Sequence, residues 1–197
     1  MREVEFFLDV GSPTTYLAWT QLPALCRAQG AALKVRPMLL GAIFQATGNA
    51  SPANVPAKSR WMNADMVRLA NRYGVPFALN PSFPINTLVL MRGATGMQMH
   101  EPARFGAYVD AMYHAMWVAP RNLNDPAIVG AVLQEAGFDA AKVLALANAQ
   151  DVKDRLKAVT QEAVERGVFG APTMFVGPQM FWGQDRLDFV REELARA

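Results

Sequence analysis

The fold is decided by the stretch Phe6-Phe7-Leu8-Asp9-Val10-Gly11-Ser12-Pro13. An apolar run stops at Gly-Ser-Pro and a helix-like pattern follows at once, which is typical of a buried strand that feeds the N-terminus of a helix. Pro13 fits the first helical turn, where its missing N–H is not needed. Ser12 is therefore expected at the junction between strand and helix.

A second stretch far downstream, Gly170-Ala171-Pro172-Thr173, places a proline just before the short apolar run Met174-Phe175-Val176. A thioredoxin-type fold brings two such points together, and in its redox members the junction carries Cys-x-x-Cys. Here the junction reads Ser12-Pro13-Thr14-Thr15. The scaffold pattern is present and the redox pair is missing, so any thiol would have to come from a ligand.

Between and around these stretches the pattern predicts a strand, a helix, a strand, a long helical region, and then two strands and a helix. The first strand is expected over 4–10, the first helix from Pro13 to about Gln29, and the second strand over 33–39, as a right-handed βαβ unit. The other expected elements are helices over 42–48, 56–73, 85–99, 103–117, 125–136, 140–146 and 151–166, a hairpin over 173–176 and 180–182, and a final helix over 186–195.

This order predicts an α/β fold, a thioredoxin-like domain (βαβ…ββα) interrupted by a large all-helical insertion. Residues 1–40 together with 168–197 are expected to form the thioredoxin-like domain, and residues 41–167 the inserted helical domain. A chain of 197 residues suits one domain or a small domain that carries an insertion.

The composition limits the class of protein. Hydrophobic residues make up 52% of the chain and charged residues 18%, which indicates a large core or an apolar surface for a partner subunit or substrate. The net charge of +2 comes without a basic run, so no nucleic-acid partner is expected. No apolar stretch approaches the roughly 20 residues that span a bilayer. No membrane partner is therefore expected. Met1-Arg2-Glu3 leads straight into a strand pattern, so no signal peptide is expected either. With a single cysteine, which cannot form an intrachain disulfide, a reducing compartment and hence a cytoplasmic protein are expected.

The chain has one cysteine and two histidines. Cys26 lies on the apolar face of the first predicted helix, which favours a small core residue over a nucleophile. His100 and His114 have no setting typical of a Ser-His-Asp triad, and these three residues do not make a zinc set, so no metal is expected. His114, among large apolar neighbours, is expected in the core or at a substrate pocket.

Ser12 has two interpretations. A serine before a helix is commonly an N-cap, whose side-chain oxygen accepts hydrogen bonds from backbone N–H groups. Alternatively, its hydroxyl points outward at the helix N-terminus, where the helix dipole favours anions. A thiolate placed there would gain a hydrogen bond and a lower pKa.

Three groups of residues together resemble one family. They are Phe7-Leu8-Asp9-Val10-Gly11-Ser12-Pro13-Thr14-Thr15-Tyr16-Leu17, Phe169-Gly170-Ala171-Pro172-Thr173-Met174-Phe175 and Phe181-Trp182-Gly183-Gln184-Asp185-Arg186-Leu187. At this spacing the chain resembles the 2-hydroxychromene-2-carboxylate isomerases, bacterial relatives of kappa-class glutathione transferases. The similarity covers essentially the whole chain and includes Gly48-Asn49, Lys58 and Pro84-Ile85-Asn86-Thr87.

The resemblance implies glutathione as a cofactor. Ser12 would be the catalytic residue and would donate its hydroxyl to the glutathione sulfur. Pro172 would be cis, which marks a fixed loop. That loop would expose the backbone of Ala171, which would pair with the cysteinyl backbone of the tripeptide as an added strand does.

The resemblance also implies contacts with the two ends of the tripeptide. Gln184 and Asp185 would hold the γ-glutamyl end, with Asp185 facing its ammonium. Lys58 would meet the glycyl carboxylate, and Asn49 would bond nearby. Without the resemblance, Lys58 reads as a solvated lysine and Asp185 as a helix cap, and Pro172 also fits an ordinary trans proline at a strand start.

The implied activity is a glutathione-dependent isomerisation of 2-hydroxychromene-2-carboxylate, a small aromatic carboxylate, in the degradation of naphthalene-type compounds. Trp61, Phe83 and Trp182 are candidates to stack on the aromatic ring. A kappa-class transferase or peroxidase that acts on another electrophile would share every glutathione residue, and a binding protein without catalysis is a third alternative. The family and the apolar composition imply a homodimer.

Overall fold

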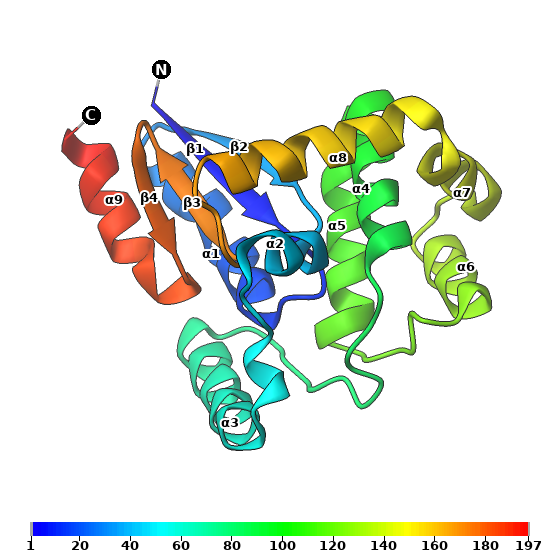
Figure 1. The fold of residues 1–197 in the computed structure, drawn as a ribbon, viewed down its shortest axis with the longest axis horizontal. Helices are drawn as coiled ribbons and strands as arrows, with labels where there is room; N and C mark the ends of the chain where they lie inside the picture. The colour runs from blue at the N-terminus through cyan, green and yellow to red at the C-terminus, as the bar shows by residue number, and fades with distance from the viewer. Residues whose placement is uncertain (1, 197) are drawn as a thin grey trace.

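A computed structural model describes residues 2–196, so that Met1 and Ala197, the outermost residues of the predicted first domain, lie outside the described residues. Within this range a sheet is formed with the strand order β2-β1-β3-β4. β1 (Glu3–Leu8) pairs in parallel with β2 (Ala32–Pro37) and antiparallel with β3 (Thr173–Val176). β3 pairs antiparallel with β4 (Gln179–Trp182). Both ends of the chain therefore build one sheet (Figure 1).

Helices cover both faces of this sheet, because the central strand β1 is apolar on both sides. Phe6 lies in a core cluster with side chains of α1 (Pro13–Ala28) and α9 (Leu187–Arg196). Its neighbour Phe7 points the other way, into a second cluster with side chains of α8 (Gln150–Glu165).

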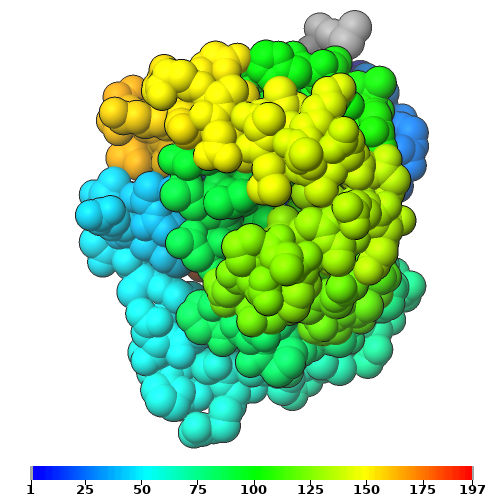
Figure 2. All heavy atoms as spheres, turned by 90° about the vertical axis from the view of Figure 1, so that its right-hand side faces the viewer, coloured from blue at the N-terminus to red at the C-terminus, as the bar shows by residue number. Residues whose placement is uncertain are grey.

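The middle of the chain is helical, as predicted. Its side chains, coloured green to yellow, form most of the face in Figure 2. No helix among residues 2–196 is long and apolar enough to cross a membrane. The remaining elements are α2 (Leu40–Thr47), η1 (Pro52–Asn54), α3 (Pro56–Tyr73), α4 (Leu88–His100), α5 (Pro102–Trp117), α6 (Pro126–Glu135), α7 (Ala140–Asn148) and η2 (Gln184–Arg186).

The sheet and the helical region share one core. Phe6 of β1 lies in the same cluster as Met91 of α4 and Tyr113 of α5. The order of elements confirms a thioredoxin-like fold with a helical insertion, whereas the division at 40/41 and 167/168 stays a prediction.

Two element ends differ from the prediction because a polar side chain ends the regular pattern. β1 stops at Leu8 rather than at residue 10, because Asp9 leaves the sheet and its carboxylate accepts from the N–H of Gly11. α4 starts at Leu88 rather than at residue 85, because the side chain of Asn86 accepts from the N–H of Leu88 and holds the preceding residues as a loop.

A group of charged side chains covers the cluster around Phe7, beside the edge strand β2. The guanidinium of Arg36, only 8% exposed, pairs with both Glu5 and Glu162. Arg166 pairs with the same two carboxylates and lies 3.9 Å from the ring centre of Phe175. Partial burial alone would raise the pKa of Glu5 and of Glu162, but the hydrogen bonds and charges of the two arginines lower both.

We expect Arg36→Met to reduce the free energy of unfolding at neutral pH by about 3 kcal/mol, because it leaves two partly buried carboxylates with one cation fewer. Carboxylates with a lowered folded pKa stabilise the fold above their unfolded pKa, here near 4.5, and lose this contribution as the pH falls through the folded pKa. The difference between variant and parent in urea unfolding should therefore shrink at acid pH. The matched control, Arg68→Met, removes an exposed ion pair and should stay within about 1 kcal/mol of the parent. A difference that did not change with pH would contradict the charge argument.

Candidate functional site

The structure confirms the N-cap interpretation of Ser12, whereas a role of its hydroxyl toward a bound anion stays a prediction. Ser12 is the N-cap of α1, and its Oγ accepts a hydrogen bond from the backbone N–H of Thr15 at 3.2 Å. The same hydroxyl lies 3.2 Å from the carbonyl oxygen of Ala171. The cap therefore fixes the Ser12 hydroxyl beside the loop that precedes β3.

The peptide bond between Ala171 and Pro172 is cis, as the resemblance implied. Neither the N–H nor the C=O of Ala171 pairs with another backbone group among residues 2–196. Its carbonyl is approached by the hydroxyls of Ser12 and Thr14. In the described chain, Ala171 therefore lacks the backbone partners that an adjacent strand would supply.

The buried side chain of Asp9 stabilises the junction between β1 and α1. Its carboxylate is buried and accepts hydrogen bonds from the N–H of Gly11 at 2.9 Å, the N–H of Leu40 at 2.8 Å and the hydroxyl of Thr87 at 3.0 Å. Burial raises the pKa of Asp9, and these three hydrogen bonds oppose the rise. The carboxylate thus joins the β1–α1 junction to the starts of α2 and α4.

Gln184 and Asp185 follow β4, whose end lies beside the loop with the cis bond before Pro172. The N–H of Gly183 donates to the carbonyl of Pro172 at 3.0 Å, and the hydroxyl of Tyr73 donates to the carbonyl of Gln184 at 3.3 Å. Gln184 is buried, whereas the side chain of Asp185 is half exposed and lies 3.3 Å from the guanidinium of Arg186. The structure therefore ties Gln184 and Asp185 to the cis-proline loop.

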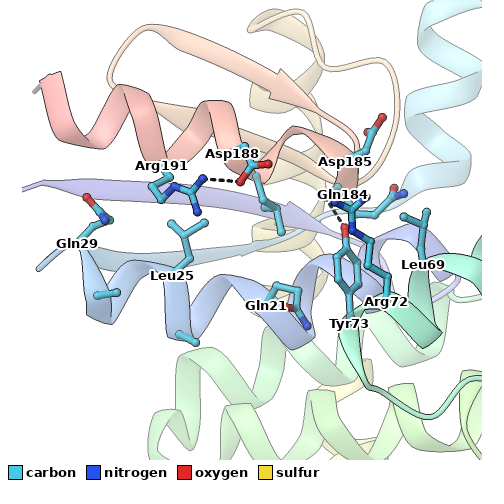
Figure 3. A pocket seen from close by; sticks show the side chains of 13 residues that line it. Gln21, Leu25, Gln29, Leu69, Arg72, Tyr73, Gln184, Asp185, Asp188 and Arg191 are labelled. Atoms are coloured by element: carbon cyan, nitrogen blue, oxygen red, sulfur yellow. Dashed lines mark hydrogen bonds and ion pairs between the residues drawn. The ribbon is translucent and has the colours of Figure 1, made fainter.

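A groove of about 530 Å³ runs between α1 and α9 and ends at the last turn of α3 (Figure 3). Gln184 and Asp185 belong to its wall, and Ser12 and Ala171 do not. The other residues of the wall are Gln21, Ala24, Leu25, Ala28, Gln29, Leu69, Arg72, Tyr73, Leu187, Asp188 and Arg191.

Among the described residues, the structure connects Asn49, but not Lys58, to the loop before Pro172. The side-chain amide of Asn49 donates to the carbonyl of Phe169 at 2.8 Å, two residues before Ala171. Lys58 is exposed in the first turn of α3. No hydrogen bond or ion pair within the described range joins Lys58 to the other predicted site residues.

The three candidate aromatic residues are all exposed at the surface. The indole of Trp182 packs so closely on Gly170 that a Cβ there would lie 2.6 Å from its Nε1, and its ring centre lies 5.0 Å from that of Phe169. Trp61 is 62% exposed on α3, and Phe83 packs against Trp117. Trp182 is thus placed directly beside the loop that carries Ala171.

The cysteine and histidine predictions have different outcomes. Cys26 is buried, and burial raises the pKa of its thiol to about 11, which suits the predicted core residue. The expectation of burial is wrong for His114, because its side chain is exposed on α5 while Tyr113 and Ala115 on either side are buried. The alternative, a place at a substrate pocket, stays a prediction.

Sequence reasoning gave no role to Asp9 or Thr14. A carboxylate at the end of an apolar strand is a signal that was available for Asp9. Thr14 gave no comparable signal, and the cis bond between Phe83 and Pro84 was also not predicted.

Comparisons with known proteins identify the family of this chain. A family model described as DSBA-like thioredoxin domain matches residues 3–195. A 2-hydroxychromene-2-carboxylate isomerase of Sphingobium xenophagum is 34% identical over 201 residues, which is 98% of each chain. Glutathione S-transferase kappa 1 of Rattus norvegicus is 28% identical and covers 96% of this chain and 89% of that protein.

Among solved structures, a selenomethionine 2-hydroxychromene-2-carboxylate isomerase superposes with a TM-score of 0.85 at 27% identity. The match covers 98% of this chain and 95% of that chain. The comparisons confirm the predicted fold class and the resemblance.

We expect Asp9→Ala to reduce the free energy of unfolding by about 3 kcal/mol, because three donors in and around the core lose their acceptor. Urea unfolding measures this change. The matched control is Asp110→Ala, which removes an exposed carboxylate that accepts one bond from the indole of Trp19, and it should cost about 1 kcal/mol or less. Equal effects of the two variants would show that Asp9 does not hold the junction.

Proposed function

We propose a glutathione-dependent isomerisation for this chain, because it belongs to the DSBA-like thioredoxin domain family and, within it, to the 2-hydroxychromene-2-carboxylate isomerases related to kappa-class glutathione transferases. The substrate is 2-hydroxychromene-2-carboxylate and the product trans-o-hydroxybenzylidenepyruvate. The observation that carries the proposal is a junction with a hydroxyl in place of a thiol, placed 3.2 Å from the carbonyl oxygen of Ala171, a residue without backbone partners in the described chain.

The donor set at the junction fits glutathione. The cis bond before Pro172 leaves the N–H and C=O of Ala171 without backbone partners in the described chain, as pairing with the cysteinyl backbone requires. Asp185 offers an exposed carboxylate for an ammonium, and Lys58 an exposed cation for a carboxylate. Gln184 and Asn49 would complete the two ends.

When bound, glutathione would supply a thiolate whose addition to the conjugated double bond of the ring-opened substrate allows rotation, and whose expulsion re-forms the double bond in the trans product and regenerates glutathione. Ser12 would stabilise the sulfur anion by donating its hydroxyl, at a helix N-terminus whose dipole favours negative charge. Trp182, whose indole lies against Gly170 in the same loop, would offer an aromatic surface to the substrate ring.

A kappa-class transferase that acts on another electrophile is the second candidate. It is favoured by the relative from Rattus norvegicus, which covers nearly the whole chain. Both candidates share the glutathione residues. An assay of the chromene substrate, followed by the spectrum of its trans product, distinguishes the isomerase from the transferase.

We expect calorimetric titration with reduced glutathione to show binding with release of a proton, because the thiol would ionise at the N-terminus of α1. S-methylglutathione, which has no ionisable thiol, should bind without proton release. Ser12→Ala should retain binding, raise the pKa of the bound thiol by about one unit and slow turnover, since one hydrogen bond to the anion is lost. No binding of either ligand would contradict both enzyme candidates, and an unchanged thiol pKa in Ser12→Ala would contradict the role of Ser12.

We expect Lys58→Ala and Asp185→Ala each to weaken glutathione binding about tenfold, which corresponds to the loss of one charged contact. Neither variant should move the pKa of the bound thiol, because both side chains would act at the ends of the tripeptide. Calorimetry measures the affinity, with Lys157→Ala as a control that removes an exposed lysine of α8. An affinity equal to that of the parent would remove the corresponding residue from the site.

A further inference from the structure

Three oxygen atoms meet at the junction in a closed triangle. The hydroxyls of Ser12 and Thr14 are 2.9 Å apart, and each lies within hydrogen-bond distance of the carbonyl oxygen of Ala171, at 3.2 and 3.1 Å. Thr14 is half-buried, and its hydroxyl has no further partner among residues 2–196.

The triangle holds two hydroxyl protons and three contacts, and the carbonyl can only accept. Ser12 also accepts the N–H of Thr15, which orients its oxygen. The Ser12 hydroxyl has two acceptors within reach, the hydroxyl oxygen of Thr14 and the carbonyl oxygen of Ala171, and it gives its single proton to one of them. The Ser12 hydroxyl therefore has to break its hydrogen bond to Thr14 or Ala171 before it can donate to any other group.

Thr14 can replace Ser12 as the hydrogen-bond donor to the Ala171 carbonyl, so the carbonyl keeps a donor when Ser12 turns away. The hydroxyl of Thr14 reaches the Ala171 oxygen at a slightly shorter distance than Ser12 does. A carbonyl oxygen has two lone pairs, so a bond from Thr14 leaves one acceptor position for the backbone N–H of a bound peptide. Ser12 is then free to turn its proton outward.

We propose that Thr14 is a positioning residue that takes over the Ala171 carbonyl, so that the Ser12 hydroxyl donates to a sulfur anion bound at the start of α1. The inference deepens the proposed function and rests on it. Thr14 acts through Ser12 and need not touch the sulfur itself.

The test is the pKa of the thiol of glutathione bound to the full chain, followed by ultraviolet absorbance of the thiolate against pH. Thr14→Val keeps the shape of the side chain and removes its hydroxyl. It should raise the pKa of the bound thiol by about half a unit to one unit, because donation by Ser12 then competes with its bond to Ala171. Thr14→Ser keeps a hydroxyl and should restore the parent pKa.

The matched control is the next threonine in the chain. The hydroxyl of Thr15 is buried and has no hydrogen-bond partner in the described part of the structure. Thr15→Val removes this hydroxyl and leaves the backbone N–H that Ser12 uses, so the thiol pKa should stay at the parent value. Should Thr14→Val unfold, which circular dichroism reveals, Thr14→Ala gives the same comparison.

A double variant separates action through Ser12 from direct contact. If Thr14 acts through Ser12, Thr14→Val adds no further shift to Ser12→Ala, and the two effects are not additive. A full second shift in the double variant would overturn the proposal, because Thr14 would then contact the sulfur directly. An unshifted pKa in Thr14→Val, with a shift in Ser12→Ala, would overturn the inference and leave the proposed function intact, whereas loss of glutathione binding in the parent chain would overturn the proposed function itself.

Discussion

The buried carboxylate of Asp9 is the constraint on which the site depends. One side chain accepts from Gly11, Leu40 and Thr87, which lie on three segments far apart in the sequence. Each donor would lose a hydrogen bond in a low-dielectric interior if the carboxylate moved. The end of β1, the start of α2 and the start of α4 are therefore fixed relative to one another, and Ser12 follows directly from the first of them.

Two further contacts reinforce the junction from the helical region. The indole of Trp117 in α5 donates to the carbonyl of Val10 at 2.9 Å, and the N–H of Val10 points at the sulfur of Met91 in α4. The backbone groups of the residue between Asp9 and Gly11 are thus satisfied by the insertion rather than by the sheet. The loop that carries Ser12 is therefore held by the inserted helices as well as by the sheet.

The sequence predicted those parts that depend on local chemistry. The bounds of α3 were predicted correctly, since Pro56 begins the helix and Gly74 ends it with a positive φ. The cis bond before Pro172 followed from the resemblance. The triple role of Asp9 was not predictable, because two of its three partners lie 31 and 78 residues away from it. Burial of His114 was wrongly expected, because apolar neighbours in a helix do not determine the direction of one side chain between them.

The presence of a hydroxyl in place of a thiol at Ser12 bears on the kind of chemistry that the scaffold supports. A cysteine there would be ionised by the helix terminus and could form a disulfide. Ser12 occupies the same electrostatic position, with its oxygen held by the N–H of Thr15, but cannot be oxidised to a disulfide. Since Cys26 is buried with a raised thiol pKa, no reactive protein thiol competes at this site within the described chain. The field of α1 is then available to an anion that a ligand brings and takes away again, which is the condition for reversible addition rather than for redox exchange.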